Sequence, residues 1–269
     1  MTEGGWIRRG AGERECIEAF FYGKAYAPHR HDTYTIALTT HGVQSFNYRG
    51  ALRHSSPGGI VVLHPDELHD GQAGTDEGFG YRSICIAPTD LQRVLGGRAL
   101  PFVPDGVSTD GRLQAVVEML LGDLDHPLEA AEYDDMLYDL ARRMAHLDDN
   151  AACAGGPLES ADLRAVECAR DYIDAHLLEG FDLATLEQVT DQSRWQLSRD
   201  FRALLGTSPY RYLVMRRLDL ARQGLLEGRR LVDIAHACGF ADQSHFTRHF
   251  KKTYGQAPKR WLTSVHATP

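Results

Sequence analysis

The stretch "PHRHDTY", residues 28–34, carries two histidines, His29 and His31, separated by one residue. Side chains two positions apart on a β-strand point to the same face, so both imidazoles would be presented to one space. Two convergent imidazoles suit a metal ion or a general-base pair. These residues therefore raise the question of whether the chain is a metalloenzyme or whether this pocket serves another purpose.

The C-terminal part contains an internal repeat. The segment 197–213, "LSRDFRALLGTSPYRYL", aligns without gaps with 246–262, "FTRHFKKTYGQAPKRWL". Matching positions include Gly206 with Gly255, Pro209 with Pro258, Arg211 with Arg260 and Tyr212 with Trp261. Each copy follows a shorter apolar pattern that ends at a turn residue, Asp191 or Gly239, and such a turn favours a left-handed backbone. We therefore predict two helix-turn-helix units.

The second helix of each unit separates an apolar stripe from a polar face. The polar residues that we expect to contact DNA are Arg194, Trp195, Gln196, Ser198, Arg199 and Arg202 in the first copy, and Gln243, Ser244, His245, Thr247, Arg248, Lys251 and Lys252 in the second. A solvated surface is the alternative interpretation of such a face. Arginine and glutamine suit base edges and lysine suits phosphates, and a merely solvated surface does not favour the outward Trp195. We predict that both helices enter the major groove.

The charge distribution agrees with an anionic partner for the C-terminal part alone. The whole chain carries a net charge of -8, but residues 181–269 carry 14 basic against 8 acidic residues. Residues 1–157 carry 13 basic against 23 acidic residues. DNA is therefore expected to meet only the last third of the chain.

A helix that begins at Pro209 is expected to join the two units. Such a stiff spacer would hold both reading helices at a fixed separation. A separation of about 34 Å, one turn of B-DNA, would let both enter adjacent major grooves on one side of the duplex.

Short β-branched and aromatic runs between turns fill residues 33–87, a pattern typical of an antiparallel sandwich or barrel. Apolar residues then recur at helical spacing over 113–124 and 133–147. These two helices would either cover the barrel or pair two chains into a homodimer. We predict an α+β protein: an N-terminal jelly-roll barrel with two covering helices, followed by an all-α domain.

Composition places the domain boundaries and the compartment. The segment 148–160 is small, polar and rich in glycine, so we divide the chain into 1–150, a linker 151–160, and 161–269. The 5 cysteines are scattered and never form a C-x-x-C spacing, which argues against disulfides, zinc knuckles and dithiol chemistry. An N-terminal export signal and a run of about 18 apolar residues are both absent, so we expect a cytoplasmic protein with no membrane partner.

The segment "IAHACGFADQSHFTRHFKKTYGQAPKRW" resembles the signature of the AraC family of bacterial transcription regulators, over roughly residues 165–265. The resemblance implies a DNA-binding domain of about seven helices with two helix-turn-helix units joined by a long helix. The first unit departs from the family pattern at Glu187, where alanine is common, and at Asp191, where glycine is common. These departures put the tightness of the first turn in doubt.

The N-terminal part is similar to the cupin-type effector domain of such regulators, through "PHRHDTY", "PGGIVVLHPDELHDG" and "YRSICI". The resemblance implies that His29, His31 and His69 would be the ligands of a metal-binding cupin. The carboxylate expected four or five residues after His31 is missing, because Thr35 and Ile36 stand there. Three interpretations stay open: an effector pocket lined by His29, His31, Tyr34, His69 and Arg82, a divalent metal held by the three histidines, or hydrogen-bonded structural histidines. His64 is an alternative to His69.

The hypothesis that follows is a sequence-specific transcription regulator, not an enzyme. Its N-terminal barrel would bind a small-molecule effector, and its C-terminal helices would bind double-stranded promoter DNA. As an activator it would also contact RNA polymerase. No cofactor is certain from the residues. The alternatives are a metal-dependent cupin oxygenase or isomerase that carries a DNA-binding module, and a DNA-repair sensor with a zinc-held cysteine, which the scattered cysteines disfavour.

Overall fold

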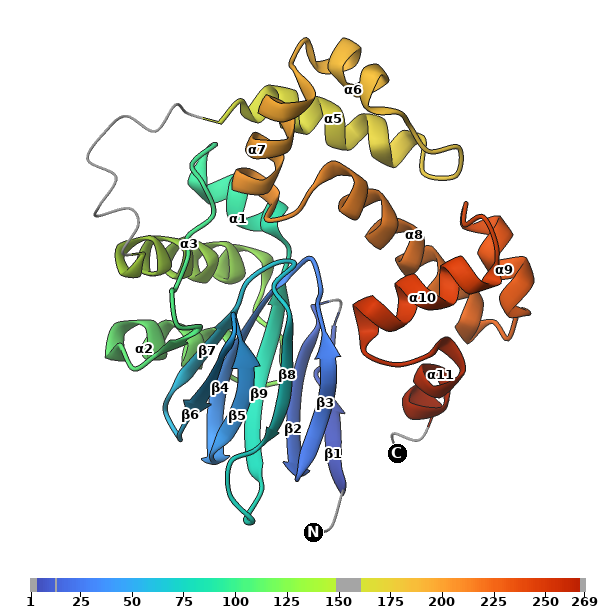
Figure 1. The fold of residues 1–269 in the computed structure, drawn as a ribbon. Helices are drawn as coiled ribbons and strands as arrows, with labels where there is room; N and C mark the ends of the chain where they lie inside the picture. Colours follow the sequence, from blue (N-terminus) through green and yellow to red (C-terminus); the bar gives the residue numbers. More distant parts are fainter. Residues whose placement is uncertain (1–3, 13, 149–160, 267–269) are drawn as a thin grey trace.

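The computed structural model describes residues 4–12, 14–148 and 161–266 and contains an N-terminal β-domain and a C-terminal helical domain (Figure 1). This architecture confirms the predicted α+β fold. The expected linker 151–160 lies outside the described residues. Among the described residues, none of the helices is both long and apolar enough to cross a membrane.

Within the described parts of the chain, ten strands form two antiparallel sheets. They are β1 Gly4–Arg9, β2 Cys16–Tyr22, β3 Lys24–His29, β4 Tyr34–Gly42, β5 Gln44–Tyr48, β6 Ala51–Ser55, β7 Ile60–Leu63, β8 His69–Ala73, β9 Phe79–Ile86 and β10 Val107–Ser108. One sheet has the order β1-β2-β9-β4-β7-β10 and the other β3-β8-β5-β6. The strands between 33 and 87 confirm the prediction, whereas β1 to β3 and β10 lie outside the segment in which strands were predicted.

The central strands of the six-stranded sheet are buried on both faces. Phe79 and Tyr81 of β9 face the interior between the sheets, where they join a cluster of aromatic side chains. Ile84 and Ile86 of the same strand belong to a second cluster, which the helices cover. The change of side along one strand follows from the two-residue period of β-structure.

Three helices cover the outer face of this sheet: α1 Pro88–Leu95, α2 Gly111–Leu120 and α3 Ala130–Leu147. The predicted apolar stripes of α2 and α3 lie mostly in the cluster on the sheet, so covering the barrel is their main role. Met119 and Tyr138 remain about half exposed, at 51% and 48%. The short helix α1 was not predicted. It adds a third covering helix to the two that were expected.

The helical domain consists of seven helices among the described residues: α5 Leu163–Ala175, α6 Leu183–Thr190, α7 Arg194–Leu205, α8 Pro209–Leu226, α9 Leu231–Ala237, α10 Gln243–Tyr254 and α11 Pro258–His266. Two separate cores hold them together. Leu213 of α8 belongs to the core of the first unit, and Val214 and Leu218 of the same helix belong to the core of the second. The predicted spacer helix therefore takes part in both helix-turn-helix units.

The turns and caps of the two units match the repeat. Asp191, with φ of 53°, and Gly239, with φ of 74°, both adopt the left-handed backbone expected at the turns. Asp242 accepts the backbone N–H of His245 at 2.7 Å and caps α10, as predicted. Ser193 accepts the backbone N–H of Gln196 at 3.3 Å at the start of α7.

Candidate functional site

The apolar stripes of α7 and α10 are buried, and their polar faces point outward. Leu197, Phe201, Phe246 and Phe250 are at most 1% exposed. On α10, one open surface face carries the side chains of Gln243, Ser244, Thr247, Arg248, Lys251 and Lys252. This is the arrangement that a helix needs for insertion into a groove.

His245 lies apart from that face, although we expected it to contact DNA. Its ring packs 5.7 Å from the ring of Phe240 and 4.6 Å from the ring of His249. Both neighbours belong to the helical domain, so the imidazole turns toward the body of the second unit and away from that face.

On α7, Trp195 is 75% exposed, which is unusual for a large aromatic side chain. Arg199 and Arg202 are exposed, and their guanidinium groups bind polar groups of their own helix, Gln196 and Ser198 respectively. Arg194 differs, because Glu187 of α6 binds its guanidinium at 3.0 and 3.2 Å. All four side chains are exposed, and Arg194 differs from the other three because a residue of the preceding helix binds it.

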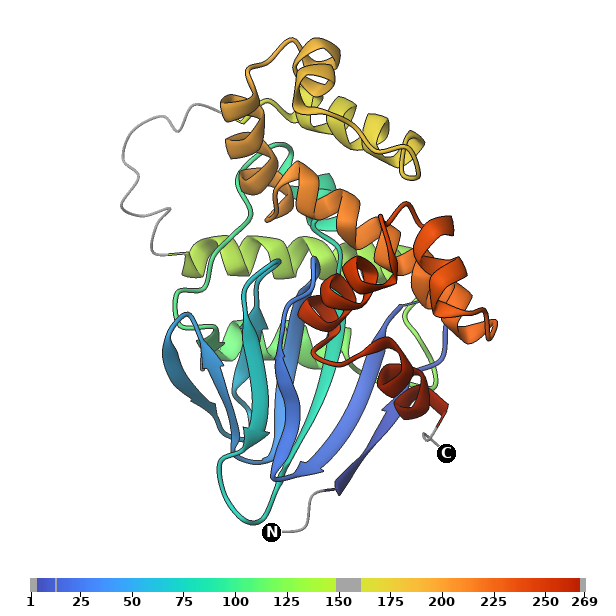
Figure 2. The same ribbon diagram turned by 45° about the vertical axis from the view of Figure 1, so that its right-hand side comes forward.

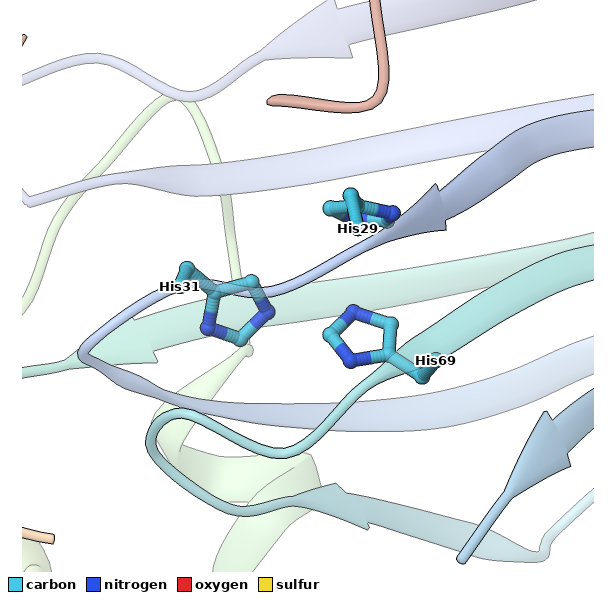
Figure 3. A group of neighbouring side chains, drawn as sticks. All are labelled: His29, His31 and His69. Carbon is cyan, nitrogen blue, oxygen red and sulfur yellow. The ribbon is translucent and has the colours of Figure 1, made fainter. Parts of the chain in front are cut away.

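The three histidines of the barrel come together at one end of the smaller sheet (Figure 3). His29 ends β3 and is the cross-strand partner of His69, which begins β8. Ring centroids lie 4.4 Å apart for His29 and His69 and 4.8 Å apart for His31 and His69. One ligand atom from each ring falls within 4.8 Å of the others. We call His29, His31 and His69 the histidine triad.

Backbone carbonyls fix the tautomer of every ring in the triad. Nδ1 of His29 lies 2.9 Å from the carbonyl of Ala27, and Nδ1 of His31 lies 2.8 Å from that of Thr33. Nδ1 of His69 lies 3.0 Å from the carbonyl of Glu67. A carbonyl oxygen can only accept, so each Nδ1 carries the proton and each Nε2 keeps its lone pair. This is the tautomer and the outer-shell contact typical of metal-bound histidine.

The triad is held in its neutral form. Burial, followed by the neighbouring His31, lowers the pKa of His29 to about 4. Burial also lowers the pKa of His31, and it lowers the pKa of His69 well below the usual value. All three imidazoles are therefore able to donate a lone pair at neutral pH.

Thr35 stands where a metal-binding cupin would carry a carboxylate, and it still reaches the triad. Its hydroxyl lies 3.2 Å from Nε2 of His31, which can only accept the hydroxyl proton in the tautomer described above. A metal ion would compete with the hydroxyl for this lone pair. The donor set offered by these residues is three neutral nitrogens, enough for a tetrahedral site with one open position.

Tyr34 and Arg82, expected beside the triad, lie elsewhere. The hydroxyl of Tyr34 donates to the carbonyl of Pro101 at 2.7 Å, within the cluster that the helices cover. Arg82 was expected to face the barrel interior, but it points to the other side of the sheet. Its guanidinium binds Glu18 at 3.0 Å and the carbonyl of Gly122 at 3.1 Å. These two side chains sit on the helix-covered face of the six-stranded sheet.

His64 is not part of the triad either. Its Nε2 accepts the backbone N–H of Val103 at 2.9 Å, and its Nδ1 lies 2.5 Å from the hydroxyl of Tyr48. Both ring nitrogens therefore have protein partners, and the structure selects His69 over His64.

Sequence reasoning missed a set of ion pairs that join the two domains. Asp32 pairs with Arg216 of α8, and Asp66 pairs with Arg211 of the same helix at 3.1 Å. Arg30 donates its backbone N–H to the carbonyl of Thr253 at 3.3 Å. Residue types carry no signal for such pairs, because the partners are brought together by domain packing alone.

A β-barrel domain joined to two helix-turn-helix units is the architecture of a ligand-responsive DNA-binding regulator. Two family models match the chain: the AraC-like ligand binding domain over residues 12–141 and a helix-turn-helix domain over residues 186–264. Together they match more than three quarters of the chain. The chain belongs to the AraC family of transcription regulators.

Curated relatives agree with this assignment over nearly the whole chain. The chain is 26% identical to the HTH-type transcriptional regulator YbfI of Bacillus subtilis, with 85% of each chain covered. It is 25% identical to the transcriptional activator RhaS of Yersinia pestis, over 91% of this chain and 92% of RhaS. These relatives are regulators, and the alternative of a cupin enzyme finds no support among them.

Solved structures show the same fold. ToxT from Vibrio cholerae superposes with a TM-score of 0.63 at 14% identity, covering 95% of this chain and 99% of ToxT. A second ToxT structure, of the protein bound to an unsaturated fatty acid, gives a TM-score of 0.63 at 15% identity over 97% of this chain and 99% of ToxT. At these identities the likeness concerns the fold alone.

Proposed function

We propose that this regulator reads promoter DNA with the outward faces of α7 and α10. The observation that carries the proposal is the duplication itself: two helices, each held by a buried apolar stripe, present exposed arginines to solvent. In this role, Arg199 and Arg248 would reach base edges, whereas Lys251 and Lys252 would bind phosphates.

The test is binding to an operator selected from random duplexes with the purified full chain. Arg248→Ala should weaken operator binding by about 1 to 3 kcal/mol and relax the base preference at one position. Arg9→Ala, a change of an exposed arginine on β1, outside both recognition faces, is the matched control and should bind like the wild type. An unchanged operator affinity for Arg248→Ala would contradict the proposed docking.

We further propose that the ligand sensed at the triad is a divalent metal ion. Three imidazoles, each with Nδ1 bound to a carbonyl and Nε2 unprotonated, support this proposal more strongly than an organic effector. Tyr34 and Arg82, the other polar groups of the expected effector pocket, point away from the triad. Zn²⁺ and Co²⁺ both suit a tetrahedral site of nitrogen ligands.

Cobalt provides a direct test, because tetrahedral Co²⁺ absorbs visible light strongly. The metal-free chain titrated with Co²⁺ should develop these absorption bands at one equivalent. His31→Ala should abolish them, and His41→Ala, a change of an exposed histidine on β4, should not. Bands that survive in His31→Ala would place the metal elsewhere.

Three further assignments complete the proposal. Since RhaS is named a transcriptional activator, we propose activation through contact with RNA polymerase, in the cytoplasm where promoter DNA is found. We also propose that the chain forms a homodimer through the exposed face of α2 and α3, which includes Met119 and Tyr138. A single monomer mass by light scattering at micromolar concentration would remove the homodimer from the proposal.

A further inference from the structure

Thr35 is the link in a short chain of hydrogen bonds that ends at the triad. Because Nε2 of His31 can only accept in the tautomer described above, the Thr35 hydroxyl, 3.2 Å away, donates to it. The oxygen of Thr35 keeps lone pairs of its own, and Sγ of Cys85 lies 3.6 Å from it. The chain therefore runs from the Cys85 thiol through the Thr35 hydroxyl to His31.

Binding of a metal ion by the triad would remove the acceptor of the Thr35 hydroxyl. The lone pair on Nε2 of His31 would go to the metal, and the sulfur of Cys85, the other close neighbour, is only a weak acceptor. A partly buried hydroxyl that loses its acceptor costs free energy unless another acceptor replaces it. The loaded site would therefore present an unused hydrogen-bond donor beside the metal.

The charge of the loaded site favours an acceptor that is negative. Three neutral imidazoles leave the charge of a divalent ion uncompensated, and a tetrahedral site with three protein ligands keeps one position open. In the parts of the chain that the structure describes, the triad is the only group of three or more potential ligands, and no carboxylate belongs to it. A small anion from solution would supply both the fourth ligand and the negative charge.

The acidic side chains close to the triad bind other partners. Asp70 of β8 accepts the backbone N–H of Asn47 at 2.6 Å and its side-chain amide at 2.9 Å. Glu15 has its carboxylate 3.6 Å from the guanidinium of Arg9, while its carbonyl accepts the backbone N–H of Cys85 at 3.1 Å. Glu15 is the main alternative as a fourth ligand, because Cys85 begins the hydrogen-bond chain to the triad.

The surroundings of the triad suit a ligand of a few atoms. His29 and His31 are partly exposed, whereas His69 is buried, so solvent reaches the site from one side. In both ribbon views α10 lies beside β3 (Figures 1 and 2), and a Cβ atom on Gly255 would lie 3.3 Å from Cβ of His29. The helical domain therefore packs directly against the end of β3 and restricts the space there.

We propose that a small, singly charged anion completes the metal site, and that Thr35 selects this ligand by donating its hydroxyl proton to it. This inference rests on the metal site proposed above. A carboxylate at position 35 would fill the fourth position and offset part of the metal charge. A hydroxyl leaves the position open and offers a donor to the ligand that occupies it. Thr35 is thus a specificity-determining residue for the fourth ligand.

The test follows the visible absorption bands of the cobalt-loaded full chain during a titration with sodium azide. Azide should change these bands along one saturable curve, because a new ligand alters the electronic surroundings of the ion. Sodium perchlorate at the same ionic strength should leave the bands unchanged, because perchlorate coordinates metals weakly. This comparison uses the unmutated chain and does not depend on the folding of any variant.

Substitutions at Thr35 test the hydroxyl itself. Thr35→Val keeps the shape of the side chain without the donor, so azide affinity should fall about ten-fold or more, and Thr35→Ser should restore most of it. Thr35→Glu supplies a carboxylate, so cobalt should still bind and the response to azide should disappear. Thr40→Val, the same change at a partly exposed position of β4, should behave like the wild type.

The outcomes separate this inference from the metal site on which it rests. Absence of the cobalt bands from the wild type would overturn both. Bands that vanish in His31→Ala but do not respond to azide would overturn the anion and leave the metal site intact, and a response gained in Glu15→Gln would identify Glu15 as the fourth ligand. Equal azide affinities of the wild type and Thr35→Val would overturn the role of Thr35.

Discussion

Glu187 of α6 binds both the backbone and the side chain of Arg194, the first residue of α7. Its carboxylate accepts the backbone N–H of Arg194 at 2.7 Å and binds the guanidinium at 3.0 and 3.2 Å. The resemblance to the family signature marks Glu187 as a departure from the alanine that is common there. The structure gives the departure a local role, because Glu187 satisfies one of the free N–H groups at the start of the recognition helix.

Glu187→Ala should raise operator affinity. The change removes a negative charge beside the DNA-facing surface and releases Arg194 for phosphate contact, so we expect tighter binding by about two- to ten-fold. The loss of the capping contact should lower the free energy of unfolding by at most about 1 kcal/mol. Anisotropy titrations at matched salt check the first effect, with Glu179→Ala, an exposed position of the same domain, as the control. Weaker binding would mean that Glu187 positions α7 for DNA.

Asp191→Gly should stabilise the first helix-turn-helix unit. Asp191 has a φ of 53°, which glycine adopts without the steric cost that a side chain bears. We expect the free energy of unfolding to rise by up to about 1 kcal/mol. The greater conformational entropy that glycine gives the unfolded chain reduces this gain. Urea unfolding followed by circular dichroism measures the difference. A loss of stability would show that the aspartate side chain stabilises the turn.

Trp195→Ala should separate DNA binding from stability. The side chain is 75% exposed, so its removal should change the free energy of unfolding by no more than about 0.5 kcal/mol. Operator affinity should fall at least several-fold, because the ring would lie on the duplex. If unfolding and operator binding both stay as in the wild type, Trp195 does not contact DNA.

His64 should make the barrel sensitive to acid. Burial, followed by the charge of Arg49, lowers the pKa of His64 to about 3, so the folded state excludes a proton that the unfolded state binds below pH 6.5. Its contribution to stability is complete above pH 6.5 and declines as the pH falls from there toward 3. Protonation would also point Nε2–H at the N–H of Val103, two donors facing each other.

The measurement is the free energy of unfolding against pH, with a chelator present so that no metal occupies the triad. Between pH 6 and 5, His64→Gln should show a slope smaller than the wild type by up to about 1.4 kcal/mol per pH unit, the value for one proton. Identical slopes in the two proteins would mean that the His64 imidazole titrates normally in the folded chain.

The amino-acid sequence by itself determined the helical domain. Its elements follow from local patterns: apolar spacing near 3.6 residues, a left-handed residue at each turn, and Ser193 or Asp242 at the start of each recognition helix. The repeat doubled each of these signals. Local signals were weaker for α1, which is short, and for β1 and β3, because edge strands with exposed faces lack a clear alternation of apolar residues.

The barrel site divides in the same way between sequence and structure. Residue types and spacing were enough to select His29 and His31, but only strand pairing could bring His69, and not His64, opposite them. Strand pairing also placed Arg82 on the far face of its sheet, because a residue's side is set by its register with the neighbouring strand.

The ion pairs between the two domains were decided by the tertiary structure alone. Asp32 and Arg216 are 184 positions apart, and nothing in either local segment specifies the other. Local chemistry determines which residues can bind DNA or a metal, since that depends on side-chain type and short-range spacing. Whether the two sites can influence one another depends on how the domains pack, and packing is a property of the whole folded chain.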